Sequence, residues 1–117
     1  MISIENSMGT ITVSAEVFTT IAGDAATSCF GVKGMAGKAR EGGIAQLLRR
    51  ESMSKGVDVV FNEDNTASIA LHIIVENGVN IPTICSSIKK EVYYKVTEAT
   101  GMPVKNIDIY VDGMMVS

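Results

Sequence analysis

The pattern of the chain predicts an α+β fold. We expect a two-layer sandwich in which two main amphipathic helices pack on one face of one small mixed or antiparallel sheet. Ile69, Leu71, Ile73 and Val75 alternate strictly, which is typical of a strand with one apolar face. Two other stretches repeat apolar residues every three or four positions, as amphipathic helices do. Elements that are apolar on one side bury those sides best against one another.

The first half of the chain predicts a strand followed by a helix. Residues 9–14 predict a short strand with Ile11 and Val13 inward, and Ser14 is a suitable N-cap for the helix. The helix is expected to end at Gly31. Its expected buried stripe is Val17, Phe18, Ile21, Ala22, Ala25 and Cys29.

The middle of the chain is the least regular part. Residues 31–37 predict a brief, irregular strand, and residues 37–43, rich in glycine and charge, predict a mobile connector. Ile44, Leu47 and Leu48 predict one or two helical turns.

The second half begins with a predicted β-hairpin, formed by residues 57–61 and 67–76 around a polar turn. Pro82 suits the first turn of a second helix, which Gly101 and Pro103 end. The expected buried stripe of that helix is Ile84, Cys85, Ile88, Val92, Val96 and Ala99.

A final strand is predicted over residues 106–112. Its inward residues are expected to be Ile107, Ile109 and Val111. The pair Met114-Met115 is expected to fray or to make a small partner contact. The opposite sheet face should be more polar and face solvent or a second subunit.

Length and composition limit the classes of protein to which the chain can belong. The 117 residues predict a single domain, 1–117, with an ordinary globular balance of 46% hydrophobic and 20% charged residues. Aromatic residues make up 5% and Trp is absent, so a surface that reads bases by stacking is thinly supplied. The net charge of −3 disfavours a general nucleic-acid binder, which needs a concentrated basic footprint.

The two cysteines and the beginning of the chain bear on its compartment. Cys29 and Cys85 have no metal-ligand spacing, so buried thiols in a reducing compartment are expected. The first residues lack the features of a signal peptide, and no apolar stretch approaches the roughly 20 residues of a membrane span. We therefore expect a cytoplasmic protein whose membrane contact, if any, is peripheral and made through a partner.

A basic run lies between Lys33 and Lys55, with six basic residues against Glu41 and Glu51. It is either a solvated face or a contact for anionic lipid headgroups, a nucleic acid or an acidic partner. Together with the single histidine, it supplies the candidate partner contacts Lys38, Arg40, Arg49, Arg50, Lys55 and His72.

His72 lies on the opposite strand face from Leu71 and Ile73, where a surface or interface role is expected. A catalytic device of the Ser-His-Asp or Cys-His kind would need a nucleophile nearby, and the spacing gives no reason to expect one. The glycines of residues 31–43 lack the lysine and hydroxyl ending of a phosphate loop. No catalytic residue, metal or cofactor is therefore expected. The polar sheet face could also hold Asp58, Asp108 and Asp112, which we expect to be solubilising.

The chain resembles the alkaline-shock or general-stress protein family of Gram-positive bacteria, also called envelope stress response proteins. The similarity covers roughly residues 8–114, and the ordered set of pieces carries it. The matching pieces are Gly9-Thr-Ile-Thr-Val-Ser-Ala-Glu-Val17, Ile21-Ala22-Gly23, Gly31-Val-Lys-Gly-Met35, Ser54-Lys-Gly-Val57, Ile73-Ile-Val-Glu-Asn-Gly-Val-Asn-Ile-Pro82, Thr100-Gly101 and Ile107-Asp-Ile-Tyr-Val-Asp-Gly113.

The resemblance implies a role in cell-envelope homeostasis or stress tolerance and no enzyme activity. Some members of the family are held at the membrane by a separate anchor protein. The short ends resemble a small subgroup whose genes often lie beside a fatty-acid-kinase-like or dihydroxyacetone-kinase-like gene.

Three hypotheses about function follow. The first is a non-catalytic adaptor or scaffold that self-associates and binds a protein partner, membrane-anchored or kinase-like. The alternative is a small-molecule or lipid-metabolism-linked regulator that acts with a kinase-like partner and has a ligand-sized apolar pocket. The third, a nucleic-acid binder that uses Arg49 and Arg50, is disfavoured by the net charge.

Overall fold

The computed structural model describes residues 2–36 and 56–116, which form an α+β fold of two helices and two sheets. The elements are β1 (Ile2–Asn6), β2 (Gly9–Val13), α1 (Ala15–Thr27), β3 (Val32–Met35), β4 (Val57–Phe61), β5 (Ala67–Glu76), α2 (Ile81–Thr100) and β6 (Val104–Met115). The prediction of one sheet was wrong, because β1 and β2 form a separate two-stranded sheet. The mobile connector 37–43 and the helical turns at Ile44, Leu47 and Leu48 lie outside the described residues.

The four-stranded sheet is built around β5. The strand pairs antiparallel with β3 and β4 and parallel with β6, so the sheet is mixed. The 20-residue helix α2 connects β5 to β6, and a connection of that kind is what brings two strands into parallel register. The sequence had left the choice between a mixed and an antiparallel sheet open.

Both β3 and β4 lie along the same edge of β5, one after the other. Ala36 N–H donates to the carbonyl of His72, and Glu76 N–H donates to the carbonyl of Gly31. The backbone hydrogen-bonding groups of the even-numbered residues of β5 therefore point toward β3. In the hairpin, Asn62 N–H donates to the carbonyl of Thr66, so the backbone groups of the even-numbered residues of β5 also point toward β4. The whole opposite edge of β5 is left for β6.

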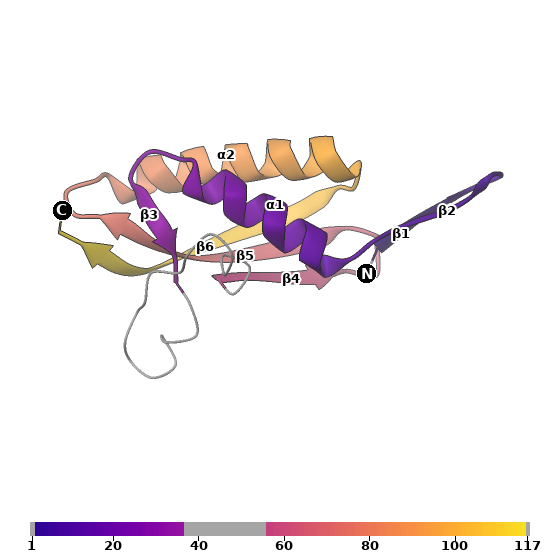
Figure 1. Ribbon diagram of the computed structural model, residues 1–117, viewed down its shortest axis with the longest axis horizontal. Helices are drawn as coiled ribbons and strands as arrows, with labels where there is room; N and C mark the ends of the chain where they lie inside the picture. The colour runs from indigo at the N-terminus through magenta and orange to yellow at the C-terminus, as the bar shows by residue number, and fades with distance from the viewer. Residues whose placement is uncertain (1, 37–55, 117) are drawn as a thin grey trace.

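Both helices lie over one face of this sheet, as Figure 1 shows, and the core is between them and the sheet. Alternate residues of β5 are buried against residues of α1 and α2. Phe18 of α1 is fully buried and meets Phe61 of β4 edge to face, with ring centroids 5.4 Å apart. Each such large apolar side chain contributes about 1.5–3 kcal/mol on burial. The buried residues of α2 are Ile84, Ile88, Val92 and Val96.

The ends of α2 follow their sequence signals. Asn80 is the N-cap, and its Oδ1 accepts from Thr83 N–H at 3.0 Å. Pro82 lies in the first turn, where its missing N–H costs nothing. Gly101 ends the helix with φ +70, a left-handed conformation that glycine adopts without strain. The predicted bounds of this helix are confirmed.

Three predicted burials were wrong. Ile11 is exposed, because β2 pairs with β1 in place of joining the main sheet. In α2, Ala99 is exposed although Val96 and Met102 are buried, and in α1 Val17 is also more exposed than the stripe predicted. The predicted end of the first helix was wrong as well. Helix α1 ends at Thr27 before Gly31, so Cys29 lies beyond it and is only half-buried.

The pair Met114-Met115 does not fray. Strand β6 continues to Met115, which pairs with Glu76, while Met114 pairs with Val75. The two side chains are exposed. Ile107 is buried and Ile109 and Val111 pack against the core, so the predicted inward phase of the last strand is confirmed.

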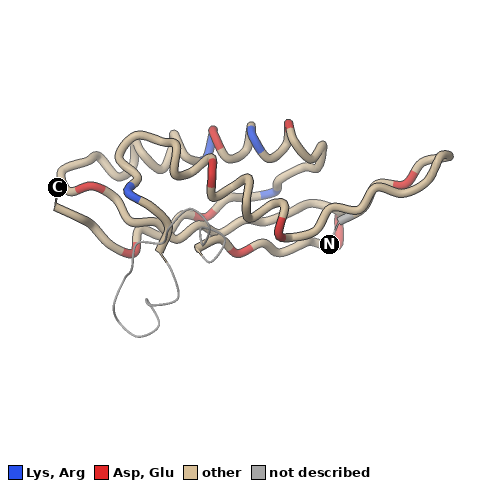
Figure 2. The backbone as a smooth tube through the Cα atoms, viewed as in Figure 1, with Lys and Arg blue, Asp and Glu red and all other residues tan. Residues whose placement is uncertain are grey.

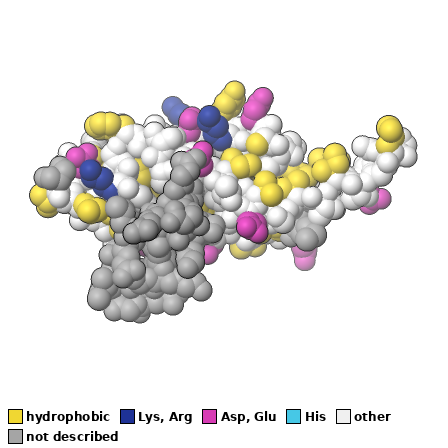
Figure 3. All heavy atoms as spheres, viewed as in Figure 1, with side chains coloured by type: hydrophobic (Ala, Val, Ile, Leu, Met, Phe, Trp, Pro, Cys, Tyr) yellow, Lys and Arg dark blue, Asp and Glu magenta, His cyan; other side chains and the backbone are white. Residues whose placement is uncertain are grey.

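Strands β1 and β2 form a hairpin that projects from the body (Figure 1). We call residues 2–13 the arm. Side chains of residues 3–12 are all exposed, and Val13, at the base, packs partly against the core. Space-filling atoms in Figure 3 show apolar side chains at the tip of the arm and along its base toward α1.

Candidate functional site

The face of the four-stranded sheet that points away from the helices carries mostly polar side chains. We call it the polar face. Its residues come from three strands, in register across the sheet. They are Asp58 and Val60 from β4, Ser68, Ala70 and His72 from β5, and Asn106, Asp108, Tyr110 and Asp112 from β6.

His72 lies at the centre of a cluster that joins all three strands. Its Nδ1 lies 2.9 Å from Asp112 Oδ2, and its Nε2 lies 3.6 Å from Asp58 Oδ2. The ring also stacks on Tyr110, with centroids 4.7 Å apart and planes within 11°. The contact with Asp112 and the stack on Tyr110 together hold the imidazole in position.

A chain of hydrogen bonds orders the other end of the polar face. Asn62 Nδ2 donates to Thr66 Oγ1 and to Ser68 Oγ, at 2.9 and 3.0 Å. Ser68 Oγ donates to Asn106 Oδ1 at 2.7 Å, and Asn106 Nδ2 donates to Asp108 Oδ2 at 3.1 Å. Each donor in this chain finds an acceptor, so the side chains hold one another in fixed conformations.

The same network reaches Asp64 in the β4–β5 turn. Thr66 Oγ1 donates to Asp64 Oδ1 at 2.6 Å, and Lys105 Nζ lies 3.7 Å from Asp64 Oδ2. The hydrogen bond from Thr66, helped by the charge of Lys105, lowers the pKa of the Asp64 carboxyl. The Asp64 carboxyl is therefore ionised at neutral pH.

The thiols lie on the other side of the sheet from His72. Cys29 packs against the core, and Cys85 belongs to α2; both are only partly buried, so the prediction of two buried thiols was wrong. Burial, and secondly the negative charge of Glu91, raises the pKa of the Cys29 thiol. The structure therefore places neither cysteine where it could form a pair with His72.

The candidate residues from the sequence fall into two groups. His72 is on the polar face, and Asp58, Asp108 and Asp112 share that face, as predicted. The candidate contacts Lys38, Arg40, Arg49, Arg50 and Lys55 lie outside the described residues.

Tyr110, Ser68 and Asn106 were missed as members of the site. The signal was present, because Asn106, Asp108 and Tyr110 alternate with the inward residues of the last strand. What alternation cannot give is the register of β6 on β5, which places Tyr110 opposite His72 and Asn106 opposite Ser68.

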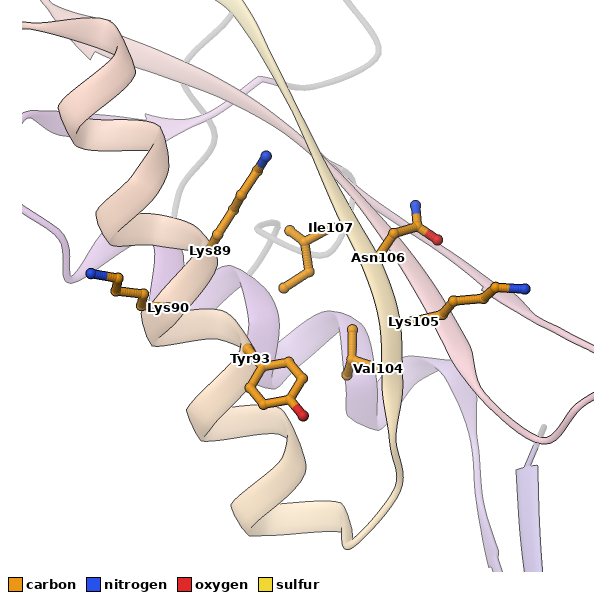
Figure 4. A pocket seen from close by; sticks show the side chains of 7 residues that line it. All are labelled: Lys89, Lys90, Tyr93, Val104, Lys105, Asn106 and Ile107. Carbon is orange, nitrogen blue, oxygen red and sulfur yellow. The ribbon is translucent and has the colours of Figure 1, made fainter.

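A second feature is an open groove of about 320 Å³ between α2 and β6 (Figure 4). Tyr93 of α2 and Val104 and Ile107 of β6 form its apolar part. Lys89 and Lys90 on the helix and Lys105 on the strand also line it (Figure 4), and Figure 2 shows basic positions along the helix and the strand.

Over residues 2–36 and 56–116, no group of His, Cys, Asp or Glu side chains is arranged to hold a metal ion. Neither described helix combines the length and the apolar character needed to cross a membrane.

The fold and the polar face define a small α+β protein with an ordered polar sheet surface. A family model matches residues 3–116, that of the alkaline-shock protein family, described as having a cell envelope-related function. The chain therefore belongs to the alkaline-shock protein family, which confirms the resemblance that its sequence pieces indicated.

Similar proteins match along nearly the whole chain. The uncharacterized protein YloU of Bacillus subtilis (strain 168) is 35% identical over 99% of this chain and 97% of its own length. The uncharacterized protein Spy1614 of Streptococcus pyogenes serotype M6 is 32% identical over 98% of this chain and 95% of its own length. No solved structure matches the chain.

Proposed function

We propose that this chain is a non-catalytic adaptor in a cell envelope-related process, which self-associates and binds a protein partner through the polar face of its sheet. The family description supports the link to the envelope. The polar face supports the binding role, because its side chains are held in place before any partner arrives.

The single observation that carries the proposal is the ordered surface around His72 and Tyr110. Tyr110 is half exposed, and its ring is fixed by stacking on an imidazole that Asp112 holds. Val60, on the same face, is 60% exposed. Tyrosine is enriched at binding hot spots, and a pre-ordered side chain loses little entropy on binding. The polar face is thus suited to a specific protein contact.

Charge on this face favours one kind of partner. Asp58 and Asp108 flank Ala70 from the two neighbouring strands, and both are exposed. Acidic side chains around an aromatic centre favour a partner segment that carries lysine or arginine. A membrane-anchored partner of this kind would bring the adaptor to the membrane surface.

The test uses the full chain as bait, with membrane and cytosolic fractions of the parent organism analysed separately, followed by binding of the purified partner. We expect one partner whose affinity falls about tenfold or more in Tyr110→Ala. Tyr94→Ala is the matched control, because Tyr94 is similarly exposed but lies on α2. Arg49→Glu with Arg50→Glu asks whether the basic segment contributes.

Two outcomes would contradict the adaptor proposal. One is the recovery of no partner from either fraction. The other is a purified partner that binds wild type, Tyr110→Ala and the Arg49/Arg50 variant with equal affinity, because the contact would then lie on neither candidate surface.

A second candidate function is that of a small-molecule or lipid-metabolism-linked regulator, and the groove between α2 and β6 favours it. Its volume of about 320 Å³ is at the lower end of the range for ligand pockets. Native mass spectrometry of the purified chain tests it, because a retained small molecule that is lost in Tyr93→Ala would support a regulator. A chain that carries no added mass, and gains none with lipid or nucleotide extracts, would exclude this function.

A further inference from the structure

The arm cannot bury its own apolar side chains. Ile4 of β1 lies opposite Ile11 of β2, and 58% of the Ile11 surface is exposed. Met8, at the turn, is 95% exposed. A two-stranded hairpin alone in water is marginally stable at best. The arm therefore has one apolar face that gains from being covered.

The chain also has a strand edge next to an apolar groove. Among the described residues, β6 pairs only with β5, so its second edge carries unpaired backbone groups. Register shifts place bulges at Lys105 and Asp112. Between the bulges, residues 106–111 form a regular edge, and the groove runs along the helix side of its first part.

The arm fits this edge in length and in pattern. Strand β1 has five residues, against a regular edge of six residues from 106 to 111. A strand added to a sheet points alternate side chains to the two faces. Ile4 would then enter the groove beside Tyr93 and Ile107, while Glu5 would extend the polar face.

Charge also matches between the two surfaces. Glu5 is the one charged residue in the sequence of the arm. Lys105 lies at the start of the regular edge, and its side chain points away from α2 (Figure 4), to the side where Glu5 would lie. A carboxylate on the incoming strand and an ammonium on the receiving strand favour this pairing over contact between two identical edges.

We propose that β1 of one copy adds as a strand to the β6 edge of a second copy, with Ile4 and Ile11 of the arm covering the groove between α2 and β6. Figure 1 shows the arm leaving the body at the end where β6 begins, so arm and groove lie at the same end. Two copies then exchange arms reciprocally around a two-fold axis. This inference rests on the self-association part of the proposed function.

The first test is sedimentation velocity on the full chain over a wide concentration range. We expect wild type to form dimers, and Ile4→Thr with Ile11→Thr to raise the dimer dissociation constant at least about tenfold. Threonine keeps the strand preference of the arm while removing its apolar face. Thr10→Ser with Thr12→Ser, on the opposite face of the arm, is the matched control and should associate as wild type does.

The second test exchanges charges. Glu5→Lys and Lys105→Glu should each weaken the dimer, and the chain that carries both should recover most of the lost affinity. Circular dichroism and urea unfolding check that the body stays folded, which we expect because residues 3–12 contribute nothing to the core.

The proposal is overturned if wild type is monomeric at every concentration, or if the Ile4/Ile11 variant associates as wild type does. The second result would point to direct pairing of two β6 edges. A monomer that still binds its partner through Tyr110 would remove the arm exchange and leave partner binding intact, so failures of the two proposals are distinguishable.

Discussion

The imidazole of His72 lies almost parallel to the ring of Tyr110, at a centroid distance of 4.7 Å and an interplanar angle of 11°. The two residues are far apart in the sequence and are brought together by the parallel register of β5 and β6. Asp112 fixes the imidazole from one side, so the stack is held by a hydrogen bond and by strand pairing together.

This stack should be measurable as a coupling energy. We expect His72→Ala and Tyr110→Ala each to destabilise the chain, with a coupling of about 0.5–1.5 kcal/mol in a double-mutant cycle measured by urea unfolding. Asp58→Asn is the control, because its 3.6 Å contact is exposed and should contribute less than about 0.5 kcal/mol. Additive effects of the two ring substitutions would show that the stack contributes nothing to stability.

Gly31 should tolerate a side chain poorly. Its φ is +89, and a Cβ there would overlap Ile84 Cδ1 and crowd Val79. Gly31→Ala should therefore cost about 2–4 kcal/mol of unfolding free energy, from backbone strain and overpacking together. Gly78→Ala is the matched control, since Gly78 has φ +92 but open space around its Cα, and it should cost about 1–2 kcal/mol. Equal costs would show that Ile84 moves aside freely.

Asp64 should stabilise the fold in a way that depends on pH. Thr66 and Lys105 lower the pKa of its carboxyl below the ordinary value near 3.8. A lowered pKa means that the contribution is fully present above the unfolded pKa and disappears as the pH falls through the folded pKa.

The corresponding measurement is urea unfolding of wild type and Asp64→Ala at neutral and acidic pH. The difference between them should be larger at pH 7 than at the acid end. Glu63→Ala is the control for the loss of a carboxylate in the same turn, since Glu63 makes none of the described hydrogen bonds. A difference for Asp64→Ala that does not change with pH would contradict the assigned role of Thr66.

Cys29 should react slowly with alkylating reagents. Burial and the charge of Glu91 raise the pKa of its thiol, so little reactive thiolate is present at pH 8. Glu91→Gln should increase the rate modestly, because burial is the larger cause and remains. The rate is read by mass spectrometry of the Cys29 peptide, with Glu98→Gln as the control. A folded chain that reacts at Cys29 as fast as the unfolded chain would contradict this assignment.

Periodicity predicted the elements that form the core. An apolar stripe is buried in each of residues 57–61, 67–76 and 81–100. In these segments the inward side chains and the residues that end the element indicate the same element. Strand β2 was predicted, but β1 and its pairing with β2 were missed for the opposite reason. Ile2 and Ile4 alternate as Ile11 and Val13 do, around a turn at residues 7–8, but the exposed Ile4 and Ile11 contribute to no core.

The candidate site was only partly predictable. The alternation in residues 104–115 places Asp108 and Asp112 on the polar face, and it also contains the signal for Tyr110. The contact of His72 with Asp112 depends on the bulge at Asp112, where β6 carries one residue more than β5. A bulge changes which side chains meet across strands, and hydrophobic periodicity does not report it.

The shared edge of β5 has a consequence for how this family can change over time. Ala36 bonds to His72 and Val57 pairs with Leu71, so the chain leaves the sheet and returns to it at adjacent positions. Both ends of the connection take their register from β5. Closing a longer connection costs only about 0.6 kcal/mol for each doubling of its length. Relatives can therefore gain or lose residues between 36 and 56 while every strand pairing of the sheet is kept, which makes this the natural place for the family to diversify.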